Sequence, residues 1–213
     1  VGVDTVAPPL PDTDPPATAT APPVTGPATT PVTGDEGPPV VLRGNGIGAF
    51  AFGAAVDPVI VGLTLRWGPP DSDSGWGPAA SSPFGLCPGG EVRAVGWRGF
   101  DVLFSDGPTP HGPGGRRHFF TWEYRAASTD TPEPDPGGSR PPLQTEAGIS
   151  VGSSVAQLQQ AYGAKLELFE DEEGGGGSAF GVQLPDGGIY GFTTSNDPGG
   201  RVRSIIGGGG CGE

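Results

Sequence analysis

Gly148-Ile-Ser-Val-Gly-Ser-Ser-Val-Ala-Gln-Leu-Gln-Gln-Ala-Tyr-Gly163 is the stretch on which our prediction of the fold depends. Ser153 and Ser154 can cap a helix through their hydroxyls. The apolar residues that follow at helical spacing form one stripe: Val155, Leu158 and Tyr162. Gly163 can end the helix because glycine tolerates a positive φ. The stretch therefore predicts a short helix over residues 155–162.

A looser copy of this pattern lies earlier in the chain, between Gly46 and Gly68. Asp57-Pro58 can begin a helix there, as an N-cap residue followed by a proline. The apolar stripe of this copy consists of Val56, Leu63 and Trp67. Both copies end in the pattern Leu-x-x-x-aromatic-Gly. We therefore predict a second helix over residues 58–67 and interpret the pair as a repeated module.

Segments that read as strands follow each predicted helix. In the first half of the chain they cover residues 91–97, 100–105 and 118–125, and in the second half residues 165–169, 179–184, 189–194 and 201–206. Turns that contain glycine, some with proline as well, separate several of them, which is typical of antiparallel hairpins. We predict an α+β protein of two tandem modules, each a helix packed on an antiparallel β-meander.

Composition divides the chain into four segments. Residues 1–39 hold eleven prolines, eight threonines and no lysine or arginine, so we predict a disordered Pro/Thr-rich stalk. Residues 40–125 and 143–213 are the predicted modules. Residues 126–142 contain five prolines and form the predicted linker.

The glycine and apolar positions of the second helix resemble a pattern found in small bacterial envelope proteins. The residues that carry the resemblance are Gly148-Ile149, Gly152-Ser153, Val155, Leu158 and Tyr162-Gly163. The pattern is similar to the beta-lactamase-inhibitor-protein and outer-membrane assembly lipoprotein (SmpA/OmlA-like) families, and to secreted proteins of high-GC Gram-positive bacteria. The resemblance implies a helix before an antiparallel meander. This chain departs from the pattern in its longer first helix and its stalk, so neither inhibition nor assembly is carried over to its residues.

The charge of the chain limits its partners. The net charge is −13, and residues 143–213 hold nine acidic and three basic residues. A nucleic-acid or anionic-membrane partner needs a positive patch, so we predict neither. No run of residues is long and apolar enough for a transmembrane segment. The chain begins at Val1 and has no methionine, from which we expect a removed leader and an extracellular or cell-envelope location, including lipoprotein-like anchoring.

Cys87 and Cys211 are the two cysteines, and each lies in a turn flanked by glycine or proline. We predict a disulfide between them, as in an exported protein. The alternative is a redox or metal pair, but the two cysteines lack CxxC spacing.

Candidates for catalysis are few, so we predict no catalytic residue and no cofactor. His111 and His118 are the only histidines, and with Ser105 and Asp106 they suggest an acid, base and nucleophile set. No nucleophile-elbow pattern surrounds any serine. The simpler interpretation is that both histidines border a loop without catalytic duty.

Two acidic segments are weak candidates for calcium. Asp71 and Asp73 alternate as in a calcium loop, but the later glutamate ligand is missing. The second segment consists of Glu170, Asp171, Glu172 and Glu173. A solvated hairpin loop explains it more simply, so we predict no metal site.

Aromatic residues are the strongest candidates for partner binding. The strand over residues 118–125 places His118, Phe120, Trp122 and Tyr124 on one face, and Phe119, Thr121, Glu123 and Arg125 on the other. Trp97 can join either set. We favour the core as the place of the first face, and the alternative is an exposed binding surface. Trp76, in a glycine-flanked loop, is the better candidate for an interface.

The function that the sequence favours is therefore non-catalytic. We expect a secreted or cell-envelope-anchored binding module for a protein or a wall component. The alternatives are an exported hydrolase that uses the His111/His118 region, and a purely structural envelope protein.

Overall fold

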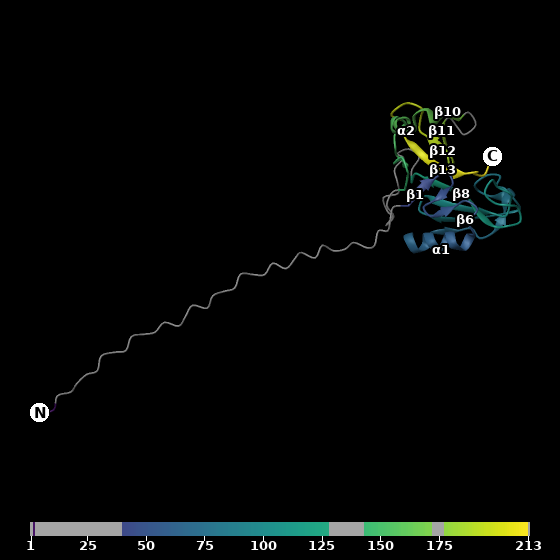
Figure 1. Cartoon of the computed structure of the whole chain (residues 1–213), viewed down its shortest axis with the longest axis horizontal. Coiled ribbons are helices and arrows are strands. Elements are labelled where there is room, and N and C mark those ends of the chain that lie inside the picture. The colour runs from purple at the N-terminus through teal and green to yellow at the C-terminus, as the bar shows by residue number, and fades with distance from the viewer. Residues whose placement is uncertain (1, 3–39, 128–142, 172–176, 213) are drawn as a thin grey trace. The chain divides into compact units, whose positions relative to one another are not determined.

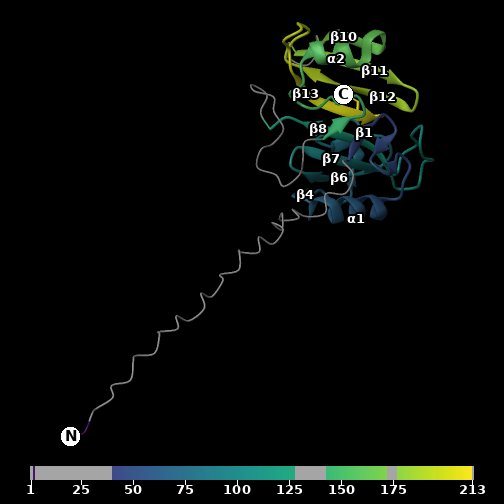
Figure 2. The same ribbon diagram turned by 60° about the vertical axis from the view of Figure 1, so that its left-hand side comes forward.

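The computed structural model describes residue 2 and residues 40–127, 143–171 and 177–212. Nearly all of the predicted stalk and most of the predicted linker lie outside these ranges, so both stay predictions. The described residues form two β-sheets and two α-helices, with two short 3₁₀ helices, η1 (Ala79–Ser81) and η2 (Gly163–Lys165). Figures 1 and 2 show them from two sides.

The larger sheet has nine strands. The first half of the chain contributes β4 (Ser72–Asp73), β5 (Gly77–Pro78), β6 (Glu91–Trp97), β7 (Phe100–Ser105) and β8 (His118–Arg125). The second half contributes β10 (Leu166–Asp171), β11 (Gly177–Leu184), β12 (Gly187–Thr193) and β13 (Val202–Gly208). The order across the sheet is β10-β11-β12-β13-β8-β7-β6-β4, with β5 also paired to β6, and neighbouring strands are antiparallel.

The predicted fold class, two modules that each pack a helix on a separate meander, is wrong. The two predicted meanders join edge to edge, because β8 from the first half pairs with β13 from the second. The pairing runs from Ser204 opposite Arg125 to Gly208 opposite Thr121. We call this pairing the seam. It gives partners to the backbone groups of two strands that would otherwise be exposed edges, and it makes one mostly β structure out of both halves.

A second, smaller sheet also joins the two halves. Its strands, in spatial order, are β3 (Phe50–Ala51), β2 (Gly46–Ile47), β1 (Val41–Arg43) and β9 (Gln144–Thr145). β9 comes from the second half and lies parallel to β1. The indole Nε1 of Trp122 in β8 donates to the carbonyl oxygens of Arg43 at 3.1 Å and Gly46 at 2.8 Å. One tryptophan of the large sheet thus holds the turn of the small one.

Both predicted helices are present, as α1 (Val56–Trp67) and α2 (Val155–Tyr162). Ser154 caps α2, and Gln157 returns a side-chain bond to the Ser154 backbone, which completes a capping box. The predicted cap of α1 is wrong. Ala55 is its N-cap residue and makes no side-chain bond, while Asp57 lies inside the first turn, where a negative charge favours the helix dipole.

Both helices pack on one face of the large sheet. Val59 and Leu63 of α1 and Leu158 and Tyr162 of α2 belong to a single buried apolar cluster. The strand residues of that cluster include Val95, Phe100, Phe104, Trp122, Tyr124, Phe180, Val182, Ile189 and Ile205. Because side chains alternate along a strand, their neighbours point to the opposite face. We call that opposite face the open face, and it carries Leu103, Thr121, Glu123, Arg125, Phe169, Tyr190, Phe192 and Ile206.

Candidate functional site

Four of the five aromatic residues predicted for partner binding are buried. Their exposed fractions are 3% for Trp97, 1% for Phe120, 0% for Trp122 and 1% for Tyr124. These four side chains are core residues, so they present no binding surface. The fifth, Trp76, is half-buried, and the guanidinium carbon of Arg117 lies 4.2 Å from its ring centroid in a cation–π contact.

The predicted alternation along β8 is wrong at one point. Leu103 and Phe104 of β7 pair with Thr121 and Phe119, so Phe120 is an extra residue between them, as in a β-bulge. Phe119 therefore joins the core beneath the helices, while Phe120 packs with Leu103 in a separate cluster on the other face. The alternating sequence pattern carries no sign of this extra residue.

The histidine region does not form a nucleophile and base pair. His118 is 0% exposed, and its Nε2 and Nδ1 lie 2.8 Å from Thr109 Oγ1 and 2.6 Å from the Arg116 carbonyl oxygen. Ser105 lies opposite His118 in the β7–β8 ladder, but its hydroxyl donates to the carbonyl oxygen of Pro88. Both side chains hold the surrounding loop in place.

Asp106 and His111 complete the residues of the suggested hydrolase site. The Asp106 carboxylate accepts backbone N–H bonds from Glu91 at 3.0 Å and Gly90 at 2.8 Å, and these bonds lower the pKa of its carboxyl. His111 is exposed, and its ring centroid lies 5.3 Å from that of Phe52. Asp106 thus holds backbone N–H groups. Among the described residues, Ser105, Asp106, His111 and His118 do not form the acid, base and nucleophile set that the hydrolase alternative needs.

Arginine residues pair with both carboxylates of the first weak calcium candidate, Asp71 and Asp73. Arg93 makes two hydrogen bonds to the Asp73 carboxylate, of 2.9 and 2.6 Å, and this contact lowers the pKa of Asp73. Asp71 accepts the backbone N–H of Arg98 at 2.8 Å. The second loop, Glu170 to Glu173, lies partly outside the described residues. Across the described ranges, no group of three histidine, cysteine, aspartate or glutamate residues is close enough to hold a metal ion.

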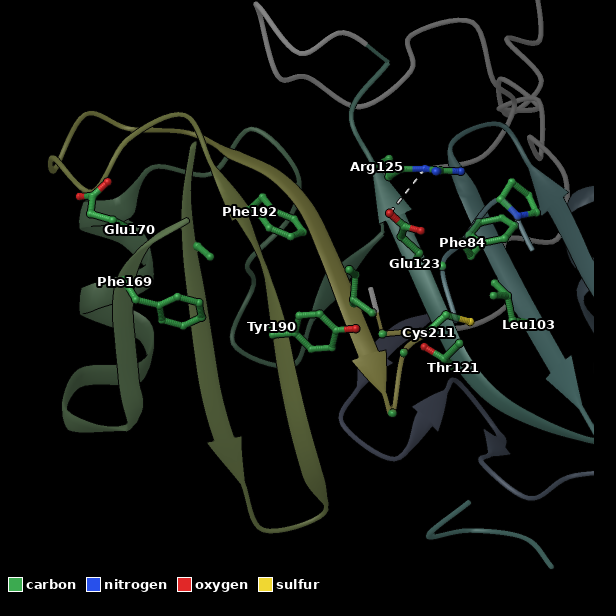
Figure 3. A pocket seen from close by; sticks show the side chains of 17 residues that line it. Phe84, Leu103, Thr121, Glu123, Arg125, Phe169, Glu170, Tyr190, Phe192 and Cys211 are labelled. Atoms are coloured by element: carbon green, nitrogen blue, oxygen red, sulfur yellow. Dashed lines mark ion pairs between the residues drawn. The ribbon is translucent and has the colours of Figure 1, made fainter. Parts of the chain in front are cut away.

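The feature that stands out on the open face is a groove of about 830 Å³, seen in Figure 3. Strand register explains why it is hollow. One row across the sheet reads Phe169, Ala179, Phe192, Ser204 and Arg125. The next row reads Glu167, Gly181, Tyr190, Ile206 and Glu123. In the first row large rings alternate with small residues, in the second Gly181 lies beside Tyr190, and space remains above the small residues.

Two segments outside the sheet form the opposite wall of the groove. These are residues 83–85, which include Phe84, and residues 209–212 near the C-terminus. The predicted disulfide is confirmed and ties Cys211, in the second segment, to Cys87, two residues after the first segment. Leu86 and Gly212 also exchange backbone hydrogen bonds, of 2.5 and 3.1 Å. The disulfide therefore fixes a wall of the groove, and such a bond is typical of proteins in oxidising compartments.

Charged side chains lie at both ends of the groove. At one end the Arg125 guanidinium donates to the Asp101 carboxylate, and its Nε lies 3.7 Å from a Glu123 oxygen. The same guanidinium is 5.5 Å from the Phe84 ring centroid. At the other end Glu170 accepts a hydrogen bond from the Asn196 amide at 2.9 Å. The groove thus combines carboxylates with aromatic rings.

Glu123 is a groove residue with a shifted pKa. Burial raises the pKa of its carboxyl, Arg125 acts against that rise, and Asp101 adds to it. Burial also raises the pKa of the Tyr190 hydroxyl, and the charge of Glu123 contributes. The Glu123 carboxylate is therefore desolvated without a neutralising hydrogen bond of normal length.

Replacing Glu123 with glutamine should remove a pH-dependent cost to stability. Because its pKa is raised on folding, the folded protein keeps this proton to a higher pH than the unfolded chain does. Stability therefore falls as pH rises through that window, and the cost persists above it. The stability of Glu123→Gln relative to wild type should increase from about pH 4 to about pH 7, measured by urea denaturation. If the stability difference between variant and wild type is the same at both pH values, the raised pKa of Glu123 is wrong.

The sequence held a signal for part of this site. Tyr190 and Phe192 share one face of their predicted strand, opposite Ile189. In the structure the helices cover the face that carries Ile189, so the two rings lie on the open face. The sequence did not show which face the helices would cover. The wall formed by residues 83–85 and 209–212 depends on contacts between distant parts of the chain, which periodicity does not report.

Comparison with known proteins gives no match: no protein family, curated protein or solved structure is significantly similar to the chain. The resemblance to the beta-lactamase-inhibitor-protein and SmpA/OmlA-like families therefore stays a prediction. The function has to be argued from the groove itself.

Proposed function

We propose that the chain is a non-catalytic binding module, secreted or anchored at the cell envelope, whose partner occupies the groove of the open face. The partner is a protein or a wall component. The disulfide supports a location outside the reducing cytoplasm. Neither helix of the described residues has the length and apolar character that a membrane-spanning helix needs.

One observation carries the proposal: exposed apolar side chains gather at this groove. Phe169 and Phe192 line it and are 49% and 36% exposed. Leu86, 61% exposed, directly follows the wall segment that contains Phe84. Exposed apolar clusters with a polar rim mark interaction sites, and aromatic residues supply much of the binding energy at interfaces.

Rigid surroundings support the same conclusion. The groove floor consists of paired strands, and the disulfide holds the opposite wall. A surface that is ordered before binding loses less conformational entropy when the partner arrives. The groove is therefore suited to binding without rearrangement of its backbone.

Changing Phe169 and Phe192 together to alanine should reduce capture of the partner at least about tenfold, as expected for the loss of interface aromatics. The immobilised chain is incubated with culture fluid and envelope extract from the cells that produce it, and bound proteins and glycans are quantified by mass spectrometry. Circular dichroism and urea denaturation should show a preserved fold, since both rings are partly exposed.

The matched control is Leu65→Ala. Leu65 is also apolar and is 83% exposed, but it lies on α1, which packs on the other face of the sheet. Leu65→Ala should leave capture unchanged. If Phe169→Ala/Phe192→Ala retains the same partner as wild type, or if both variants lose it equally, the groove is not the binding site.

A further inference from the structure

The charges of the groove are unbalanced. Among the described residues that line it, Glu123 and Glu170 are acidic and Arg125 is basic. The Arg125 guanidinium donates a hydrogen bond to Asp101, which does not line the groove. Its Nε lies 3.7 Å from the nearest Glu123 oxygen. That separation exceeds a normal hydrogen bond. Glu123, with a side chain 20% exposed, therefore keeps hydrogen-bonding capacity on the groove side.

Aromatic rings flank this carboxylate. Tyr190 stands in the same row of the sheet as Glu123, with Ile206 between them, and Phe192 lies two residues along the same strand. Figure 3 shows the Tyr190 and Phe192 rings on one side of the groove and Glu123 on the other. Aromatic faces attract cations, and the attraction grows when the cation is desolvated.

The protein already holds one cation in this way. The Arg125 guanidinium contacts carboxylates and lies over the Phe84 ring at 5.5 Å on the opposite wall. Tyr190 and Glu123 offer the same combination of an aromatic ring and a carboxylate. Between them lies open groove volume where Arg125 lies on the Phe84 side. The surface is thus complementary to a second positive group.

Building on the proposed function, we propose that the groove takes a lysine or arginine side chain of a protein partner, with its charged end at Glu123 and its methylene stem along Tyr190 and Phe192. The aliphatic stem covers the rings, as long cationic side chains do on apolar surfaces. The charged end makes a charge-assisted hydrogen bond to Glu123, which is stronger than a neutral one.

Overall charge favours the same partner class. The chain carries a net charge of −13, so a basic protein segment is steered toward it at long range. Glu167, two residues before Phe169 on β10, adds a further negative charge on the same face of the sheet. A neutral glycan can donate hydroxyl hydrogen bonds to these carboxylates but carries no positive charge to offset them, which is why a basic protein segment is the occupant we infer.

The test uses three probes that differ only in one side chain: acetyl-Ala-Lys-Ala-amide, its arginine analogue and its norleucine analogue. Norleucine keeps the methylene stem of lysine and lacks the charge. Each probe is titrated into the ¹⁵N-labelled full chain, and amide shifts of Glu123, Tyr190 and Phe192 are followed by NMR. The lysine and arginine probes should bind at least about tenfold more tightly than the norleucine probe.

Two variants locate the charge effect. Glu123→Gln keeps the shape of the side chain and should weaken the lysine probe about tenfold while leaving the norleucine probe unchanged. Asp186→Asn, in the exposed turn between β11 and β12 and outside the groove lining, should change neither. A lysine probe that binds Glu123→Gln as tightly as wild type would overturn the inference, as would equal binding of lysine and norleucine probes.

The outcomes separate this inference from the proposed function. If the norleucine probe binds as well as lysine and Phe192→Ala abolishes both, the groove remains a binding site and the cationic partner is excluded. If no probe shifts any groove amide, the inference fails whatever the capture experiment shows. If capture is unaffected by Phe169→Ala/Phe192→Ala, the proposed function fails even where the lysine probe binds.

Discussion

Replacing Cys87 and Cys211 with serine should lower the free energy of unfolding by roughly 4 to 5 kcal/mol. The bond joins residues 124 positions apart, so it removes a large part of the conformational freedom of the unfolded chain. Urea denaturation of the variant and of wild type, both without reductant, measures the difference. The change should also loosen the groove wall formed by residues 83–85 and 209–212.

The wild type under reducing conditions is the control for the double serine variant. Reduced wild type and variant should agree within about 0.5 kcal/mol, because serine differs little in size from cysteine. Amide hydrogen exchange at Leu86 and Gly212, which bond to each other across the wall, should become faster in both. Slow exchange at these two amides after reduction would show that the backbone pairing holds the wall without the disulfide.

Trp122→Ala should cost about 3 to 5 kcal/mol of stability, the usual range for removing a buried tryptophan. The side chain is 0% exposed and belongs to the core beneath the helices. It also donates to the carbonyl oxygens of Arg43 and Gly46, so its loss leaves two acceptors of the small sheet without this donor. The small sheet should therefore lose protection in hydrogen exchange before the seam does.

Two further substitutions, one at Trp122 and one at Trp76, refine this test. Trp122→Phe keeps most of the apolar ring and removes the indole donor, so it should cost less than alanine, about 1 to 3 kcal/mol. Trp76→Ala should cost less than about 2 kcal/mol, because Trp76 is half-buried and contacts Arg117 near the surface. Equal losses of stability for Trp76→Ala and Trp122→Ala would contradict the role of Trp122 in connecting the two sheets.

Local signals in the sequence predicted the secondary structure well. The serine cap and the apolar stripe placed α2 at residues 155–162, and alternation placed β6 at 91–97 and β8 at 118–125. The disulfide followed from having two cysteines in turns. These features depend on neighbouring residues, which is the information that periodicity and capping carry.

Pairing between distant strands was beyond the same signals. Each predicted meander was complete by local criteria, and nothing in the pattern of β8 or β13 says which strand lies beside it. The assignment of Phe120 to the face of Trp122 failed for a related reason, because an extra residue in one strand is defined only by its partner. The groove depends on both the strand pairing and the bulge, so alternation predicted that Tyr190 and Phe192 share a face but not that this face is exposed.

The seam has a consequence for how the molecule would respond to proteolysis. Each side of it supplies a strand that the other needs, and Cys87 and Cys211 lie on opposite sides of residues 128–142. A single cut within that interval would therefore release nothing. The two fragments would stay hydrogen-bonded and covalently tied, and would run as one species on a gel until a thiol was added.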